Sequence, residues 1–223
     1  MKNLITHLSQ FISEARWETF RQVIANRTRY ITVVLEDIYQ SQNASAVLRT
    51  CDCLGIQDVH IIENKNRFQL NPDVVLGSSK WLNLHKHCSE EENTISAMEK
   101  LRSDGYRIVA TSPHRDDTSP EEFDLTKGKV ALFFGTELKG LTSNVLEQAD
   151  EYLRIPIVGF TESFNISVSA AIILYQLTQR LRSSEIQWGL TEPEREELLL
   201  EWLRTSIKKP ELIEAAFNLK KDN

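Results

Sequence analysis

The chain has 223 residues and a formal net charge of −6, with 41% hydrophobic and 26% charged residues. This length suits one compact domain of roughly 150 to 250 residues with a short appendage, and the composition disfavours collagen, coiled-coil and disordered classes. The acidic balance disfavours a protein that coats nucleic acid by bulk positive charge, although it leaves room for a local basic patch.

The N-terminal segment is predicted to form one amphipathic helix. Its apolar residues recur at three- and four-residue intervals, which predicts a single buried stripe made of Leu4, Leu8, Phe11, Ile12 and Ala15. Residues 1–35 also carry a surplus of three positive charges. That surplus fits either solvated helix faces or a polyanionic partner.

Short apolar runs rich in β-branched residues follow, and helical stretches separate several of them. This alternation is typical of an α/β protein with a mostly parallel sheet. The predicted strands cover residues 31–35, 59–62, 106–110, 130–134 and 152–155, and the predicted helices cover 44–54, 94–102, 144–149 and 167–181.

The C-terminal segment begins with its own helix start signal. Thr191 and Glu194 form a capping box, and Pro193 lies in the first turn. Pro210 then separates this helix from a final one that is predicted to end near Leu219. The predicted buried stripe of the first of these helices comprises Leu198, Leu199, Trp202 and Leu203.

No stretch reaches the roughly 18 consecutive apolar residues that a membrane helix needs, and the first residues do not form an apolar signal core. We therefore expect a cytoplasmic protein. The three cysteines, Cys51, Cys53 and Cys88, lack metal-ligand spacing. We expect them to be reduced, mostly buried thiols, and we expect no metal site.

Three segments carry candidate chemistry, and each lies where a predicted strand ends or a helix begins, the edge at which open α/β sheets bind ligands. The first spans residues 43–50. Asn43 can cap the helix that follows, and Arg49 lies six residues further on, so both can reach the crevice end of this element. A helix cap and a surface arginine would explain the same pattern.

The second segment spans residues 133–142. Its two glycines, Gly135 and Gly140, nearly match a phosphate-binding loop, but Leu141 stands where that loop requires lysine. The segment therefore disfavours a nucleoside triphosphatase and indicates a sharp turn that can approach a ligand, with Glu137 facing the same space. A turn with a solvated glutamate is the alternative.

The third segment spans residues 155–171, where a strand meets proline and a polar loop opens a small-residue helix. Helix N-terminal amides together with Ser163, Asn165 and Ser167 predict a hydrogen-bonding floor for a polar or anionic ligand. Helix capping alone would explain only part of this group.

In this order the three segments resemble the motif set of the SPOUT superfamily, in particular the SpoU/TrmH branch of S-adenosylmethionine-dependent RNA ribose 2'-O-methyltransferases. The matching patterns are N-x-S-A-x-x-R-T, F-G-T-E-x-x-G and I-P-x-x-G-x-x-x-S-x-N-x-S. The resemblance covers about residues 30–182. The helical segments on both sides are similar to those of the tRNA guanosine-2'-O-methyltransferases of this branch, which modify a D-loop guanosine.

The resemblance implies an α/β fold whose C-terminal part threads into a trefoil knot, a known exception to the rule that chains avoid knots. It implies an N-terminal helical RNA-binding extension at residues 1–29, a methyltransferase domain at 30–182 and a C-terminal helical extension at 183–223. It also implies a homodimer whose active sites draw on both subunits, tRNA as the partner, and no DNA or membrane partner.

The resemblance further implies S-adenosyl-L-methionine as methyl donor. Carried over by position, the cofactor-binding residues are Thr111, Gly135, Ile155, Ile157 and Phe164. The family's key catalytic arginine matches Arg49, and the residues that shape its catalytic site match Asn43, Glu137, Ser163 and Asn165.

Arginine is effectively always protonated, which leaves two roles open for Arg49. It could hold the phosphate beside the target ribose and stabilise the developing 2'-alkoxide, or it could take the proton transiently in a dry site.

The sequence departs from the family pattern at three places. Residues 39–42 read Tyr-Gln-Ser-Gln where the family often has histidine and proline. Ile157 and Phe164 replace the more usual methionine and leucine, and these conservative changes should preserve cofactor binding. The arginines after the long helix, Arg180 and Arg182, are shifted by about one position.

Basic residues near both ends of the chain are the candidates for phosphate contacts with RNA. They are Arg16, Arg21, Arg27, Arg29, Arg180, Arg182, Lys208 and Lys209.

The lengths of the terminal segments favour the D-loop enzyme. Related rRNA enzymes carry a further N-terminal domain, and relatives that act on the anticodon wobble ribose largely lack the terminal helices. Two alternatives stay open: a SpoU-type methyltransferase of another tRNA or rRNA ribose, and a noncatalytic knotted RNA-binding factor.

Overall fold

The computed structural model describes residues 1–89, 92–112, 118–136 and 139–221. The chain forms two compact units. The larger unit comprises Thr28–Trp188, and the smaller unit combines Met1–Arg27 with Gly189–Asn223.

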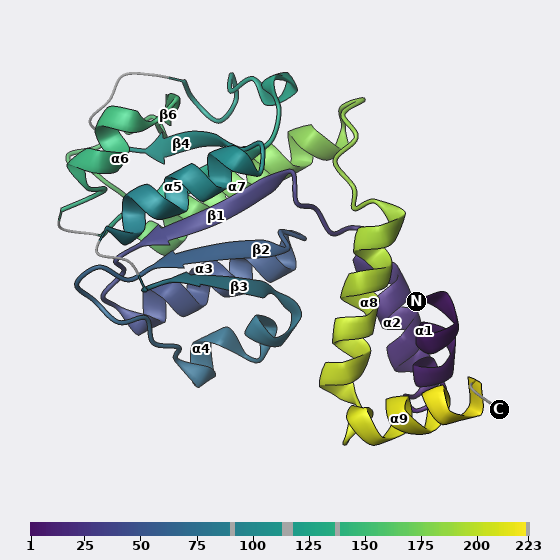
Figure 1. Cartoon of the computed structure of the whole chain (residues 1–223). Coiled ribbons are helices and arrows are strands. Elements are labelled where there is room, and N and C mark those ends of the chain that lie inside the picture. The colour runs from purple at the N-terminus through teal and green to yellow at the C-terminus, as the bar shows by residue number, and fades with distance from the viewer. Residues whose placement is uncertain (90–91, 113–117, 137–138, 222–223) are drawn as a thin grey trace. The chain divides into compact units, whose positions relative to one another are not determined.

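The larger unit is built on a six-stranded parallel sheet with the strand order β3-β2-β1-β5-β4-β6 (Figure 1). The predicted α/β class with a parallel sheet is confirmed. The strands are β1 (Ile31–Glu36), β2 (Asp58–Ile62), β3 (Asn83–His87), β4 (Arg107–Thr111), β5 (Val130–Phe134) and β6 (Glu151–Leu153).

Strand β3 is the one strand among the described residues that the sequence did not predict. It lies at the edge of the sheet and reads Asn-Leu-His-Lys-His, with half-buried and exposed positions. An edge strand needs no apolar run, because only part of its surface packs on the core.

Helices cover both faces of the sheet, and the side chains of β1 alternate between them. Val33 and Leu35 join one buried cluster with α3 (Ser41–Cys53) and α7 (Ile166–Arg182). Val34 joins the other cluster with α5 (Asn93–Ser103) and α6 (Ser143–Gln148). A strand buried on both faces explains why β1 reads as a continuous apolar run.

Helix α3 begins at Ser41, earlier than predicted. Asn43 is therefore not the helix cap that the sequence suggested, because Gln40 occupies that position. Asn43 lies inside the first turn instead and is buried. Three short helical segments were not predicted: α4 (Pro72–Val75) and the 3-10 turns Ser78–Trp81 and Leu125–Lys127.

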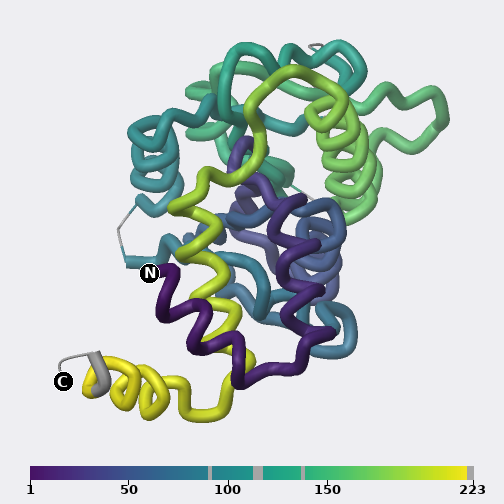
Figure 2. The backbone as a smooth tube through the Cα atoms, turned by 90° about the vertical axis from the view of Figure 1, so that its right-hand side faces the viewer, coloured from purple at the N-terminus to yellow at the C-terminus, as the bar shows by residue number. Residues whose placement is uncertain are grey.

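The smaller unit contains helices from both ends of the chain: α1 (Lys2–Ser9), α2 (Glu14–Ile24), α8 (Glu192–Ser206) and α9 (Pro210–Lys221). Figure 2 shows α1 running beside α8. The single N-terminal helix predicted from sequence is wrong. Helix α1 ends at Ser9, and Ser13 caps α2, where its hydroxyl accepts a hydrogen bond from the Arg16 amide. Phe11 and Ala15 are exposed.

Trp202 forms the centre of the smaller unit. It is 2% exposed and packs edge-on against Phe20, with 5.4 Å between ring centroids. The capping box of Thr191 and Glu194 is present, as predicted. Leu200 is buried where the sequence favoured Leu199, which is only partly buried.

A histidine cluster lies on β2 and β3, outside both helix-covered clusters. The rings of His60 and His85 stack at 4.6 Å, and His60 Nδ1 lies 3.0 Å from His87 Nε2. Burial, with the two neighbouring histidines, lowers the pKa of His60 to about 3. Asp58 partly opposes this shift, and its carboxylate also accepts a hydrogen bond from His85.

The expectation of mostly buried thiols is wrong, since Cys51 is buried but Cys53 and Cys88 are exposed. Across the described part of the chain, no helix is both long and apolar enough to span a bilayer.

Candidate functional site

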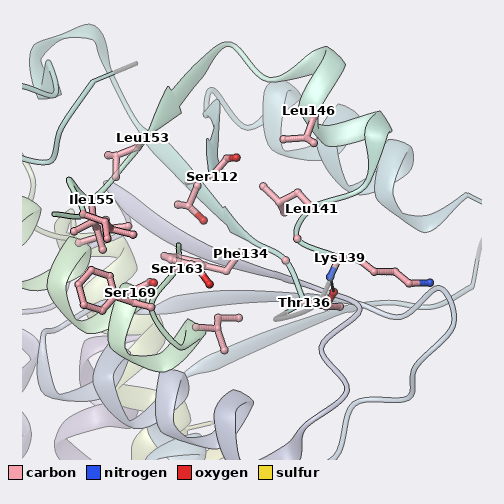
Figure 3. Close-up of a pocket in the computed structure, with 17 residues that line it drawn as sticks. Ser112, Phe134, Thr136, Lys139, Leu141, Leu146, Leu153, Ile155, Ser163 and Ser169 are labelled. Carbon is pink, nitrogen blue, oxygen red and sulfur yellow. Dashed lines mark hydrogen bonds between the residues drawn. The ribbon is translucent and has the colours of Figure 1, made fainter. Parts of the chain in front are cut away.

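A cavity of about 210 Å³ opens where β4, β5 and β6 end and α7 begins (Figure 3). In the figure, Ile155 and Ser169 lie on one side of the cavity and Thr136 and Lys139 lie on the opposite side. All the residues predicted to bind the cofactor line this cavity: Thr111, Gly135, Ile155, Ile157 and Phe164.

Gly135 is required here because the chain folds back on itself at close range. The Thr136 amide donates to the Gly140 carbonyl at 3.0 Å, and the Gly140 amide donates to the Thr136 carbonyl at 2.9 Å. A Cβ atom on Gly135 would lie 2.2 Å from the Gly140 carbonyl carbon. Because Gly135 has no side chain, backbone forms the cavity wall at this turn, and the backbone amide and carbonyl groups are within reach of a ligand.

The cavity combines an aliphatic wall with a few hydroxyl groups, the usual character of a small-molecule site. The Thr111 hydroxyl donates to the Phe133 carbonyl at 2.7 Å, which holds the end of β4 against β5. Ser163 also lines the cavity, as the sequence predicted for the polar loop. Sequence reasoning missed several further lining residues, including Ser112, Phe134, Leu141, Leu146, Leu153, Ile166 and Ser169.

Asn165 joins the polar loop to α3. Its side-chain oxygen caps α7 by accepting from the Ser167 amide at 2.9 Å and the Ser167 hydroxyl at 2.6 Å. Its amide nitrogen donates to the Asn43 side-chain oxygen at 3.2 Å. Asn43 also donates to the Gln40 side chain at 2.9 Å. The first and third segments predicted from sequence therefore meet in the fold.

Arg49 does not line this cavity. It is exposed on α3 and lies in a mostly apolar groove of about 650 Å³ between α3 and α7, together with Ala171 and Tyr175. Arg49 follows Asn43 by six residues, or about 9 Å along the helix axis. The remaining predicted catalytic residue, Glu137, lies outside the described residues.

The candidate RNA-binding arginines differ in how freely they face solvent. Arg27 is only 1% exposed, and its guanidinium lies over the Trp202 ring at 5.5 Å. The prediction that Arg27 contacts RNA is therefore corrected to a packing role, because a buried guanidinium cannot reach a phosphate. Arg16 and Arg21 are exposed, as are Lys208 and Lys209.

The other three arginines are engaged within the larger unit. Arg29 pairs with Asp58 at 3.0 Å. Arg180 donates to the Pro120 carbonyl at 2.6 Å, and Arg182 donates to the Leu54 carbonyl at 2.7 Å. Burial also lowers the pKa of Arg182. These contacts hold the ends of helices in place and restrict the reach of the guanidinium groups.

No group of three or more His, Cys, Asp or Glu side chains among the described residues is arranged to hold a metal ion.

Comparison with known proteins identifies the family. The SpoU rRNA methylase family matches residues 30–175. The tRNA (guanosine(18)-2'-O)-methyltransferase of Borreliella burgdorferi is 48% identical over 211 residues, which cover 95% of this chain and 94% of the relative. The chain belongs to the SpoU rRNA methylase family. A SpoU relative of the same name from Thermus thermophilus is 33% identical, over 86% of this chain and 97% of its own length.

Solved structures of SpoU proteins share the fold. The A. aeolicus TrmH/SpoU tRNA modifying enzyme matches with a TM-score of 0.77 and 27% identity, over 88% of this chain and 98% of that one. The SpoU methyltransferase AviRb from Streptomyces viridochromogenes, solved in complex with AdoMet, matches with a TM-score of 0.60 over 74% of this chain and 62% of that one. At 22% identity, the second match is a likeness of fold alone.

Proposed function

We propose that the protein transfers a methyl group from S-adenosylmethionine to the ribose 2'-oxygen of a D-loop guanosine in tRNA. The observation that carries this proposal is the cavity at the strand ends, which gathers residues of the second and third motifs in one wall. The contact between Asn165 and Asn43 adds the first motif. The relatives named tRNA (guanosine(18)-2'-O)-methyltransferase supply the substrate.

The residues of the cavity fit this methyl donor. Ile155 and Ile157 offer an apolar wall to the adenine ring, while the backbone around Gly135 offers hydrogen-bonding groups at close range. When bound, S-adenosylmethionine supplies a methyl group activated by a sulfonium centre. The role of this chain is to hold the two substrates in line and to keep water out.

Asn43, Ser163, Asn165 and Glu137 shape the catalytic site in this proposal. The Asn165 side chain fixes the start of α7, and through Asn43 it fixes the first turn of α3. Arg49 either holds the phosphate next to the target ribose and stabilises the developing 2'-alkoxide, or takes its proton transiently. Phosphate binding and alkoxide stabilisation are the simpler role for a guanidinium, because they require no deprotonated arginine.

The active form is a homodimer in which two subunits complete each site. Two observations support this. Arg49 lies outside the cavity of its own chain, and the groove that holds it is apolar, with Tyr175 60% exposed. A second copy packed on this groove would cover Tyr175, and we propose that Arg49 then serves the partner's cavity. We further propose that the segment around the cavity is threaded as a trefoil knot and that the enzyme works in the cytoplasm.

The helical segments 1–29 and 183–223 flank the methyltransferase domain 30–182, and we propose that they dock tRNA. Four exposed basic side chains of the smaller unit are the candidates for phosphate contacts: Arg16, Arg21, Lys208 and Lys209.

The test is methyl transfer to unmodified tRNA, followed by mass-spectrometric mapping of the modified nucleotide. The expected product is 2'-O-methylguanosine in the D-loop. Methylation of a different tRNA ribose, or of rRNA only, would contradict the proposed substrate but support the proposed methyl-transfer reaction. Tight RNA binding without any methyl incorporation would favour the noncatalytic RNA-binding factor instead.

A further inference from the structure

A second, larger cleft adjoins the cofactor cavity. Its volume is about 880 Å³, against about 210 Å³ for the cavity. It lies beyond the ends of β1 and β2, and it shares Thr136, Lys139, Gly140 and Leu141 with the cavity. A molecule in this cleft would therefore lie directly beside one in the cavity.

A buried carboxylate organises the floor of the cleft. Glu36, at the end of β1, is 1% exposed and accepts hydrogen bonds from the hydroxyls of Thr94 and Thr142, both at 2.7 Å. The Thr142 amide adds a third bond at 2.9 Å. Asn64 donates to the Thr94 hydroxyl at 2.9 Å. Because these polar groups are already satisfied, the floor is set before any ligand arrives.

The next residue, Asp37, fixes the wall of the cleft. Its side-chain oxygen accepts hydrogen bonds from three consecutive backbone amides, at residues 64, 65 and 66, over 2.7 to 3.1 Å. The Asp37 backbone has φ 57°, a conformation that non-glycine residues rarely adopt. The segment that follows β1 is thereby held against the segment that follows β2, and this places Tyr39 at the cleft.

Tyr39 lines the cleft and is 76% exposed. Two lysines, Lys65 and Lys139, line the same cleft and are also exposed. An aromatic ring and lysine ammonium groups in one cleft are a combination with which proteins hold single-stranded nucleic acid: bases stack on the ring, and phosphates approach the charges.

We propose that this cleft receives the RNA segment that carries the acceptor ribose, with one base stacked on Tyr39 and the adjoining phosphates near Lys65 and Lys139. The proposal rests on the methyltransferase function proposed above and adds the residues that hold the acceptor. Lys139 and Thr136 belong to both the cleft and the cavity, so a nucleotide in the cleft lies next to the donor. Tyr39 is a binding residue here, because its proposed partner is the substrate.

The experiment compares Tyr39→Ala, Tyr39→Trp and the double variant Lys65→Ala with Lys139→Ala. Lys80→Ala is the matched control, because Lys80 is an exposed lysine that does not line the cleft. Affinity for unmodified tRNA is measured by fluorescence anisotropy at several salt concentrations, KM and kcat by methyl transfer, and donor affinity by calorimetry with S-adenosylmethionine alone.

We expect Tyr39→Ala to weaken tRNA binding by about tenfold to a hundredfold, the usual loss when one stacked base loses its aromatic partner. Tyr39→Trp should recover the affinity, because it restores the ring. The double lysine variant should lower the slope of log affinity against log salt by about 0.7 for each lysine. Lys80→Ala should behave as wild type. Donor affinity should stay at the wild-type value in both Tyr39 variants and in Lys80→Ala, because neither residue lines the donor cavity.

Wild-type tRNA affinity and KM in Tyr39→Ala, in a protein that still methylates tRNA, would overturn the cleft proposal and leave the proposed function intact. A loss of donor affinity in Tyr39→Ala would also overturn it, by assigning the cleft to part of the donor. Absence of methyl transfer by the wild-type protein to any RNA would instead overturn the function on which the proposal rests.

Discussion

The side-chain amide of Asn165 donates to the side-chain oxygen of Asn43 across 122 residues of sequence, at 3.2 Å. Asn165 also caps α7, so one side chain sets the start of one helix and the position of another. The cap of α7 and the contact with α3 therefore depend on different atoms of the same residue: the oxygen accepts the capping hydrogen bond, and the nitrogen donates to Asn43.

Replacing Asn165 with aspartate separates these two roles. Asn165→Asp keeps the capping oxygen but removes the donor to Asn43, so we expect methyl transfer to fall at least tenfold while stability changes little. Asn165→Ala also loses the cap, which costs about 1 kcal/mol of stability. Methyl-transfer kinetics and thermal unfolding measure the two effects. Full activity in Asn165→Asp would show that the contact with Asn43 is dispensable.

Substitution of Gly135 tests the backbone wall of the cavity. A Cβ at this position would lie within 2.3 Å of the Gly140 carbonyl oxygen and the Leu141 amide nitrogen. We expect Gly135→Ala to open the turn and reduce S-adenosylmethionine affinity by more than tenfold in calorimetry. The control is Gly189→Ala, because a Cβ on Gly189 meets only a side-chain atom at 3.5 Å. Equal affinity in both variants would exclude a donor held against this turn.

Mixing two defective chains tests whether Arg49 serves the partner's site. Arg49→Ala and Asn165→Ala subunits are co-expressed with different tags, and the mixed dimer is isolated. If Arg49 acts across the interface, one of the two sites in the mixed dimer has both residues intact, and about half of the wild-type activity returns. An inactive mixed dimer would mean that each chain uses its own Arg49.

The role of the Arg49 guanidinium is tested by Arg49→Lys, which keeps the charge but loses the planar fork. We expect kcat to fall at least tenfold with tRNA affinity nearly retained, because a lysine cannot hold phosphate and alkoxide in the same two-pronged geometry. Near-normal turnover would contradict both roles considered for Arg49.

The histidine cluster predicts loss of stability in acid. The pKa of His60 is lowered to about 3 in the folded protein, against about 6.5 in an unfolded chain. Between these values the unfolded chain binds a proton that the folded protein does not, so stability is complete above pH 6.5 and falls as the pH falls toward 3. At pH 4.5 the loss from this group is about 3 kcal/mol.

Urea unfolding of wild type and His60→Gln at pH 7 and pH 4.5 measures this contribution as the difference between the two pH dependences. The matched control is His7→Gln. His7 lies in the smaller unit, outside the histidine cluster, and its ring stacks on Phe217. Parallel pH dependences for His60→Gln and wild type would remove His60 as a source of acid sensitivity.

The parallel sheet could be predicted because its central strands are buried on both faces and therefore read as apolar runs. Strand β3 could not, because its exposed edge position leaves no apolar pattern in the sequence. The break between α1 and α2 was missed for a different reason. The apolar spacing continues through Phe11 and Ala15, but α1 ends at Ser9 and α2 begins only after the Ser13 cap, and both residues are exposed.

In the candidate site, too, some residues could be predicted from the sequence and others could not. The residues that line the cavity through their motif positions, such as Thr111 and Phe164, could be named by resemblance to a family. Arg27 could not be assigned correctly, since its charge suggests a surface position and only the fold places it against Trp202. The contacts of Glu36 with Thr94 and Thr142 join segments up to 106 residues apart, and no local pattern indicates them.

The smaller unit is assembled from the two ends of the chain, with α1 and α2 packed against α8. During synthesis, α1 and α2 leave the ribosome before α8, so Ile5, Leu8 and Phe20 stay uncovered until α8 has been made. The parallel sheet can form in that interval. Removal of either end would leave the apolar faces of the other without a partner, so a shortened chain would be prone to aggregate even though its sheet is complete.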